Sequence, residues 1–197
     1  MKEISEGSAL GRVIGCGAAT TGRVYGVRRV PVVKGQSMPA YDPRAIKGNG
    51  VTYATSPMGA DHTAGYAVVS NIFGLGGRVD ALGTEGQTAL SRKMQIFSAF
   101  LDSAGLCLFT KFPFMEQPET YQAVADMLNA KYGSELVVDD LNLIGKRVLE
   151  DELDFNHRAG FTSAHDRLPD FMVDEPLPPH NSTFDISPED LDSTLKW

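Results

Sequence analysis

The stretch TALSRKMQIFSAFLDS, residues 88–103, decides the fold of this chain. Its large apolar residues recur three and four positions apart, which is the spacing of one face of an α-helix. They are Leu90, Met94, Phe97, Phe100 and Leu101. We therefore predict a long helix over this segment, the strongest helical signal in the sequence.

Weaker patterns on both sides of this stretch add further helices. Pro118-Glu119 opens one and Gly133 closes it, and Ser187 caps a last short helix that continues to the end of the chain. The predicted helices cover residues 3–15, 42–55 (weakened by a turn signal at 48–50), 88–103, 118–131, 137–158 and a short segment from 187, with an extended piece at 30–33 and irregular segments at 15–22, 56–66, 71–86 and 169–188. The fold class is therefore mainly α, a multihelical domain with long irregular connections.

Composition narrows the classes of protein that this chain can represent. It has 197 residues, 42% of them apolar, and a formal net charge of −7. A nucleic-acid partner needs clustered Lys and Arg, so the acidic balance argues against one and also against an anionic membrane surface. No apolar run approaches the roughly 20 residues that span a bilayer. With no secretory signal at the N-terminus and only Cys16 and Cys107 as thiols, we expect a cytoplasmic protein.

The segment Asp102 to Cys107 follows the strongest helix and carries chemistry-bearing residues. Gly105 permits a left-handed helix end and a close approach of the backbone to a ligand. The carboxylate of Asp102 can accept hydrogen bonds from an amino group, and Cys107 can ligate metal as a thiolate. The alternative is an ordinary helix cap followed by a buried cysteine, and the residues alone leave both readings open.

A second candidate is His62, which the segment Tyr53 to Tyr66 places in a turn among small residues. A histidine in a loop can donate or accept a proton near neutral pH. The alternative is a surface or capping histidine. The remaining histidines lack metal-ligand spacing, and Gly74 to Arg78 lacks the strand-to-helix context of a dinucleotide site.

Four blocks, taken together and in this order, carry a family resemblance. They are residues 33–36 with 39–44, residues 53–62, residues 102–107 and residues 155–161 with 166–169. In these blocks the chain resembles the C-terminal region of the aldehyde ferredoxin oxidoreductases, and residues 102–107 match that family's Asp-x-x-Gly-Leu-Cys motif. The resemblance divides the chain into 1–35, the end of a preceding helical domain, and 36–197, the C-terminal helical domain, truncated at its end.

The resemblance implies an enzyme that oxidises aldehydes to carboxylic acids and passes electrons to ferredoxin. It implies tungsten, or molybdenum, held by two pterins beside a 4Fe–4S cluster, with Cys107 as one cluster ligand. Asp102 would bind the amino-pyrimidine edge of one pterin, and the backbone of Leu106 and Leu108 would contact the same pterin. His62 would be the catalytic residue near the metal, handling protons or polarising the substrate.

Two positions depart from the family pattern. Met58 stands where many members have Arg, and Ala64 stands where many have Lys, which puts some pterin contacts and the substrate subclass in question. The other three cluster cysteines and the N-terminal part of such an enzyme are not in this sequence, so we expect the isolated chain to be inactive. Two alternatives stay open. One is a related tungsten enzyme with another substrate, such as a benzoyl-CoA reductase-type subunit, and the other is a non-catalytic helical scaffold protein.

Overall fold

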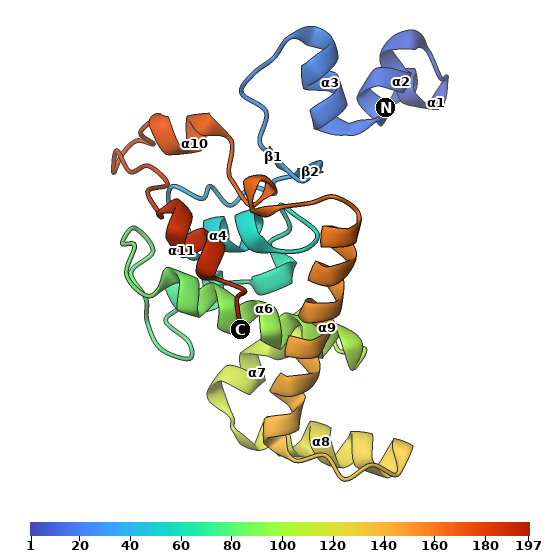
Figure 1. Ribbon diagram of the computed structural model, residues 1–197, viewed down its shortest axis with the longest axis vertical. Coiled ribbons are helices and arrows are strands. Elements are labelled where there is room, and N and C mark those ends of the chain that lie inside the picture. Colours follow the sequence, from blue (N-terminus) through green and yellow to red (C-terminus); the bar gives the residue numbers. More distant parts are fainter.

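The computed structural model describes residues 1–197 and is mainly α, as the sequence predicts: 56% of the residues are helical and the one sheet has two strands. Figure 1 shows an elongated molecule with α6 near its middle. The α-helices are α1 (Lys2–Ser5), α2 (Ala9–Gly15), α3 (Gly17–Tyr25), α4 (Lys47–Thr55), α5 (Val68–Asn71), α6 (Gln87–Ser103), α7 (Lys111–Glu116), α8 (Glu119–Tyr132), α9 (Val138–Arg158), α10 (Asp170–Asp174) and α11 (Pro188–Ser193). Three short 3-10 helices, η1 (Thr63–Gly65), η2 (Leu108–Thr110) and η3 (Ser163–His165), and an antiparallel hairpin of β1 (Val32–Val33) and β2 (Gln36–Ser37) complete the chain.

Helix α6 is the centre of the packing, which confirms the helix predicted over residues 88–103. It contacts α4, η1 and α9. All five apolar residues of the predicted face are buried. The N-terminal half of α6 contributes Leu90 and Met94 to a small cluster. The C-terminal half contributes Phe97, Phe100 and Leu101 to a larger cluster with α7, α8 and α9, which we call the lower core.

Helix α4 passes through the interior with all nine of its residues buried. The helix predicted from residue 42 is wrong at its start, because Asp42 instead forms a turn in which its carboxylate accepts the N–H of Arg44 at 2.9 Å. The predicted turn at residues 48–50 is also wrong. Gly48 and Gly50 lie inside the helix because they allow close packing: a Cβ on Gly50 would overlap the ring of Phe184.

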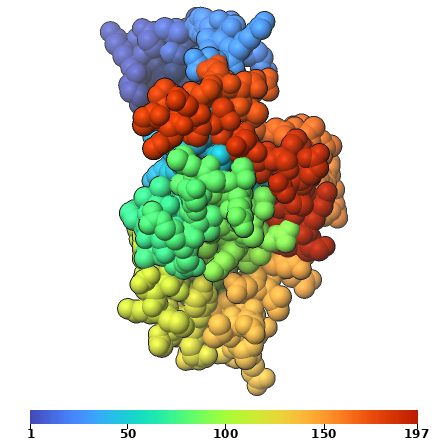
Figure 2. All heavy atoms as spheres, turned by 90° about the vertical axis from the view of Figure 1, so that its left-hand side faces the viewer, coloured from blue at the N-terminus to red at the C-terminus, as the bar shows by residue number.

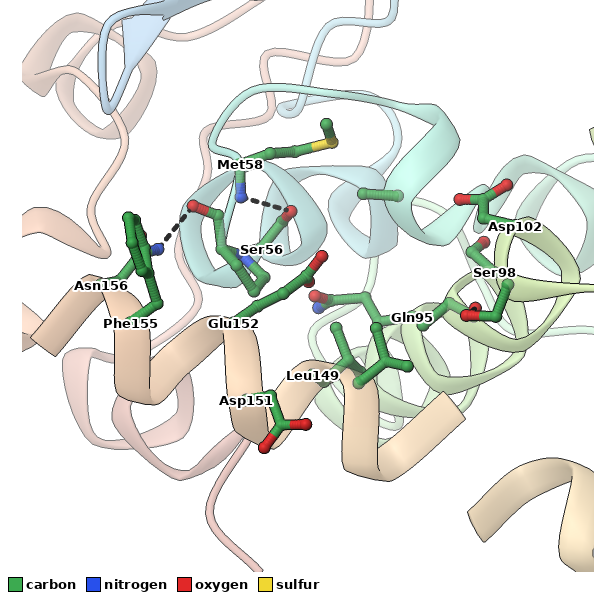
Figure 3. Close-up of a pocket in the computed structure, with 15 residues that line it drawn as sticks. Ser56, Met58, Gln95, Ser98, Asp102, Leu149, Asp151, Glu152, Phe155 and Asn156 are labelled. Atoms are coloured by element: carbon green, nitrogen blue, oxygen red, sulfur yellow. Dashed lines mark hydrogen bonds between the residues drawn. The ribbon is translucent and has the colours of Figure 1, made fainter. Parts of the chain in front are cut away.

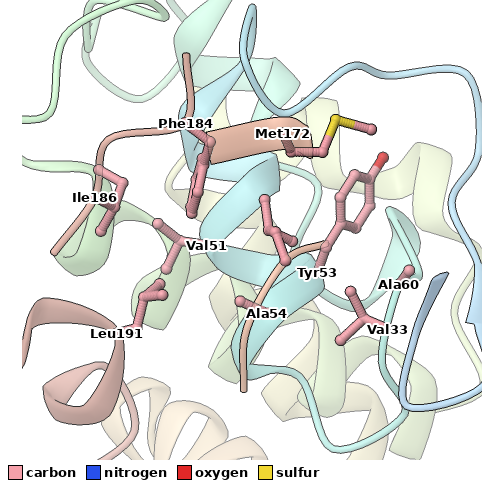
Figure 4. Close-up of a cluster of buried hydrophobic side chains, with 10 residues drawn as sticks. Val33, Val51, Tyr53, Ala54, Ala60, Met172, Phe184, Ile186 and Leu191 are labelled. Carbon is pink, nitrogen blue, oxygen red and sulfur yellow. The ribbon is translucent and has the colours of Figure 1, made fainter. Parts of the chain in front are cut away.

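The second large core surrounds α4, as Figure 4 shows. It joins residues distant in sequence: Val33 from the hairpin, Val51 and Tyr53 from α4, and side chains from the C-terminal 30 residues or so of the chain that wrap back over them. The C-terminal members are Leu168, Met172, Phe184, Ile186 and Leu191. The C-terminal segment is therefore part of the domain that holds α4.

The predicted helices at 118–131 and 137–158 are confirmed as α8 and α9, each to within a residue. Gly133 ends α8 in the left-handed conformation, at φ 66°. At the start of α9 the carboxylate of Asp140 accepts the N–H of Val137 at 2.9 Å, and Asp139 adds a second negative charge at the positive end of the helix.

Two predictions for the N-terminal segment are wrong. The single helix over 3–15 is divided into α1 and α2 at Gly7, which has φ 62°, and Ser8 caps α2 by accepting the N–H of Gly11. Residues 15–22, predicted irregular, lie largely in α3, where Gly22 packs against Val30. Figure 2 shows the segment around α10 lying directly below these helices, and Arg29 pairs with Glu175 there at 2.6 Å.

At the C-terminal end the capping prediction is confirmed, since the Ser187 hydroxyl accepts the N–H of Asp190 at 3.1 Å, and α11 then ends at Ser193. The segment 169–188, predicted irregular, contains the short helix α10. The predicted domain boundary at 35/36 falls in the turn of the β1–β2 hairpin and stays a prediction. No helix of the chain is both long enough and apolar enough to cross a bilayer.

Candidate functional site

The segment Asp102 to Cys107 folds as a Schellman helix end. Leu106 N–H donates to the carbonyl of Leu101 at 2.9 Å, and Gly105 N–H donates to the carbonyl of Asp102 at 3.0 Å. Gly105 supplies the left-handed turn at φ 69°. Leu106 packs against the lower core and anchors the turn. The chain therefore leaves the helix sharply, and the next residue is turned outward.

That next residue is Cys107, and its side chain is exposed. The carbonyl of Cys107 accepts the hydroxyl of Thr110 at 2.7 Å, which closes the turn into η2, where Leu108 lies half-buried and Phe109 is 74% exposed. An exposed thiol is available as a metal ligand, whereas the alternative of a buried structural cysteine requires an apolar enclosure. Cys107 is not enclosed in that way.

Replacing Gly105 by alanine tests how much this turn depends on glycine. A Cβ at this position meets no atom within 4 Å, so the only cost is the left-handed backbone. We expect a loss of about 1 kcal/mol in the free energy of unfolding, measured by urea denaturation. Ser103→Ala, two residues earlier and also exposed, should lose much less. Equal stability of the two variants would contradict the role given to Gly105.

His62 lies at the start of η1 and is held between two tyrosine rings. Its ring stacks on Tyr41 at 5.1 Å between centroids and meets the edge of Tyr66 at 5.7 Å, while Nδ1 lies 3.4 Å from a carboxylate oxygen of Asp61. The hydroxyls of Tyr41 and Tyr66 are 3.1 Å apart. Burial and this hydrogen bond raise the pKa of Tyr66 to about 12. The imidazole is thus fixed in orientation and remains partly open to solvent.

The loop that carries His62 is fixed to α4 and α6. Lys34, itself buried, donates from Nζ to the carbonyls of Ala54 at 2.7 Å and Ser56 at 3.0 Å at the end of α4. Gly65 lies so close to α6 that a Cβ there would come within 2.7 Å of Cγ of Gln95. Glycine is required at this close approach because any side chain would push η1 away from α6.

A groove of about 640 Å³ lies beside this loop, between the end of α4, α6 and α9. Figure 3 shows its residues. Asp102 is part of its lining, together with Met58 and Ala64, the two positions that depart from the family pattern. Gln95 of α6 and Glu152 and Phe155 of α9 also line the groove. The groove is mainly apolar in its side walls and carries carboxylates but no Lys or Arg.

The charges around the groove interact. Partial burial raises the pKa of Asp102, the charge of Lys111 lowers it, and Asp61 raises it again. Partial burial also raises the pKa of Glu152, and Asp102 adds to this effect. Asp61, the residue before His62, thus contributes to the surroundings of Asp102.

Lys111 is the buried cation behind Asp102. It has no exposed surface, donates from Nζ to the hydroxyl of Ser98 at 2.8 Å, and lies 5.4 Å from the centre of the Phe97 ring. Burial lowers the pKa of Lys111 to about 7, against the opposing influence of Asp102. A charged or half-charged amine therefore lies inside the protein close to a candidate ligand-binding carboxylate.

The structure brings some of the predicted site residues together and leaves others apart. Asp102, Leu106, Cys107 and Leu108 share one turn at the end of α6. His62 is not part of this turn and lies on the loop at the start of η1. Only Asp102 among the five lines the groove. No three His, Cys, Asp or Glu side chains gather in a way that would hold a metal ion.

Three residues of this region were missed by the sequence analysis. Gln95 lies seven positions before Asp102, a spacing that places both on one side of α6, so the helical pattern contained that signal. Glu152 and Lys111 come from α9 and α7, and their approach to Asp102 depends on how the helices pack. No local pattern in the sequence identifies them.

Comparison with known proteins identifies the family of this chain. The family model for the aldehyde ferredoxin oxidoreductases, domains 2 and 3, matches residues 1–196. The tungsten-containing aldehyde ferredoxin oxidoreductases of Pyrococcus horikoshii, Thermococcus kodakarensis and Pyrococcus furiosus are each 36% identical to it over 148 residues, or 74% of the chain. The chain belongs to the aldehyde ferredoxin oxidoreductase family. It spans 24% of the length of these relatives.

Proposed function

We propose that this chain is the part of a tungsten-dependent, cytoplasmic aldehyde oxidoreductase that holds one pterin and one corner of an iron–sulfur cluster. The observation that carries the proposal is the helix end at Gly105, because it presents Asp102 to a groove and Cys107 to the surface within one turn. In this function the complete enzyme oxidises an aldehyde with water to a carboxylic acid, releasing two electrons and two protons. Ferredoxin, or a similar protein, would accept the electrons.

The residues present fit the recognition of a pterin. The amino-pyrimidine edge of a pterin offers N–H donors, and the carboxylate of Asp102 is an acceptor at the rim of a groove with apolar walls. The backbone of Leu106 and Leu108 would contact the same group from the turn. When bound, the tungsten held by two pterins, or molybdenum in its place, would supply the two-electron oxidation. The chain's own part is to bind and orient the pterin.

The residues present do not by themselves fit a 4Fe–4S cluster. Such a cluster needs four thiolates, and the two cysteines lie in different parts of the chain, Cys107 just before η2 and Cys16 just before α3. We propose that Cys107 supplies one ligand and that further polypeptide, corresponding to the N-terminal part of the relatives, supplies the other three. The exposure of Cys107 supports this, since a shared cluster must lie at a surface between the two parts.

His62 is the proposed catalytic residue. An aldehyde oxygen gains negative charge when its carbonyl carbon is attacked, so a donor held near that oxygen lowers the barrier. The Tyr41 and Tyr66 rings hold the imidazole in one orientation, and Nδ1–H of His62 can donate to the carboxylate of Asp61. His62 would therefore hold and move a proton at its other ring nitrogen, Nε2.

The test compares the complete enzyme with its His62→Ala variant, both purified anaerobically from cells supplied with tungstate. We expect the variant to keep its tungsten and iron while aldehyde-dependent reduction of a viologen dye and of ferredoxin falls at least about a hundredfold. The isolated 197-residue chain should contain neither metal and show no activity. Tungsten together with aldehyde oxidation in the isolated chain would contradict the proposed division of ligands.

Met58 and Ala64 favour one second candidate, a related tungsten enzyme with another substrate such as an aromatic acyl-CoA thioester. Both positions line the groove, so a change there alters the surroundings of the cofactor and substrate. The same purified enzyme assayed with aldehydes and with thioesters separates the two activities. A complete protein with neither activity and no metal would instead support a helical scaffold.

A further inference from the structure

Gln95 at the base of the groove has a side-chain amide whose orientation is fixed by its neighbours. The Thr55 hydroxyl donates to the carbonyl of Val51 at 2.8 Å, so toward Gln95 it can only accept. Nε2 of Gln95 therefore faces Thr55, at 2.9 Å, and also donates to Ser91 at 3.1 Å. This orientation leaves Oε1 on the opposite side, with no hydrogen-bond donor.

Leaving Oε1 of a fully buried glutamine without a hydrogen-bond donor lowers the stability of the folded state. Gln95 has no exposed surface, and a buried polar atom normally has at least one partner. An apolar residue of similar shape would remove this unpaired acceptor, although it would also lose the hydrogen bonds that Nε2 donates to Thr55 and Ser91. Because Gln95 lines the groove, a bound group that presents an N–H there would remove the deficit.

The space in front of Oε1 is shared with a carboxylate from the opposite helix. Figure 3 shows the amide of Gln95 on α6 and the carboxylate of Glu152 on α9 pointing toward one another, while Asp151 points away. Glu152 lies close enough to Asp102 for the two charges to influence each other. Figure 3 places Asp102 at one end of the labelled lining and Gln95 with Glu152 nearer its middle, and no Lys or Arg lines the groove.

We propose that Gln95 and Glu152 form a second recognition point for the pterin, taking N–H donors of its reduced ring while Asp102 takes the amino-pyrimidine edge. This inference rests on the proposed function. A reduced pterin fits because it is flat and carries N–H groups both at its pyrimidine edge and farther along the ring system. The apolar walls from Leu149, Phe155 and Met58 suit the faces of such a ring.

The experiment titrates the purified 197-residue chain with 6-methyltetrahydropterin under anaerobic conditions and measures binding by calorimetry. Asp102→Asn tests the proposed function, and Glu152→Ala and Gln95→Met test the second recognition point. Asp154→Ala is the matched control, because it removes the same charge from the same helix outside the groove. Circular dichroism of each variant shows whether it is folded, and Glu152, at an exposed position, provides a test that does not depend on repacking the core.

We expect binding by the wild-type chain, a loss of about tenfold in affinity for Glu152→Ala and for Gln95→Met, a larger loss for Asp102→Asn, and no change for Asp154→Ala. If Asp102→Asn weakens binding while Glu152→Ala binds like the wild type, the second recognition point is wrong and the proposed function stands. If the wild type does not bind, or Asp102→Asn binds as well as the wild type, both are overturned.

Discussion

A Gly145→Ala variant should lose at least about 3 kcal/mol in the free energy of unfolding. Gly145 lies in α9 where this helix crosses α6, and it is buried. A Cβ there would overlap the carbonyl oxygen of Ile96 and lie 3.0 Å from the backbone nitrogen of Phe100. Both atoms belong to the backbone of α6, so no side chain can rotate to make room.

The higher helix propensity of alanine opposes the loss of stability caused by this steric overlap, but it is the smaller of the two effects. Alanine in a helix interior is favoured over glycine by about 1 kcal/mol, so a mutation at an open position of α9 would stabilise the chain. At Gly145 the steric overlap wins, because relieving it requires α9 to move away from α6. That movement loosens the lower core, where Leu141 of α9 packs beside Phe97 and Phe100 of α6. It also widens the groove that lies between the two helices.

Urea denaturation followed by circular dichroism at the helix band measures the loss. Asn142→Ala on the exposed side of the same helix is the control, and it should be neutral or slightly stabilising. A Gly145→Ala chain as stable as the Asn142→Ala chain would show that α9 does not cross α6 as closely as the structure indicates.

The elements predicted well from sequence are those whose signals are local. Helices α6, α8 and α9 are long, with apolar residues at helical spacing, and Gly133 and Ser187 mark ends through their own backbone and side-chain chemistry. Such signals act within one or two turns, so neither packing nor distant residues can easily reverse them. The mainly α class followed from them.

Two of the errors, at residues 48–50 and 15–22, share one physical cause, which is that glycine was interpreted only as a helix breaker. In α4 the glycines allow the helix to lie against Phe184 and Asn71, and the burial of all nine residues compensates for their poor helix propensity. In α3 the same holds for Gly22 against Val30. Tertiary packing decides such positions, and the packing partners lie up to about 130 residues away in the sequence.

In the candidate site, too, the features set by local sequence were predictable and those set by helix packing were not. The turn from Asp102 to Cys107 was predictable because a glycine after a long helix defines it locally, and the exposure of Cys107 follows from that turn. The surroundings of Asp102 were not. Lys111 and Glu152 reach it from other helices, and the position of Glu152 depends on how α9 crosses α6 at Gly145.

A Lys111→Met variant should be more stable than the wild-type chain in acid, by about 4 kcal/mol at about pH 6. Burial lowers the pKa of Lys111 from 10.5 to about 7, so the folded state resists the proton that the unfolded state accepts. Between these two values the unfolded chain binds more protons, and wild-type stability must rise with pH. Below about pH 7 the buried amine must be protonated in the folded state as well, and the full cost to the free energy of unfolding, about 5 kcal/mol, is present. Losing the hydrogen bond to Ser98 offsets about 1 kcal/mol of the gain.

The stability difference between Lys111→Met and the wild type should therefore shrink by about 3 kcal/mol from about pH 6 to about pH 9.5. Other titrating groups cancel in this difference because both chains carry them, apart from Asp102, whose pKa Lys111 lowers. Lys93→Met, at an exposed position of α6, is the control and should give a difference independent of pH. A difference for Lys111→Met that stays constant over this range would mean that Lys111 keeps an ordinary pKa. The amine would then have to be hydrated or paired with Asp102 as a full ion pair, and the pH dependence of an Asp102→Asn chain distinguishes these two cases.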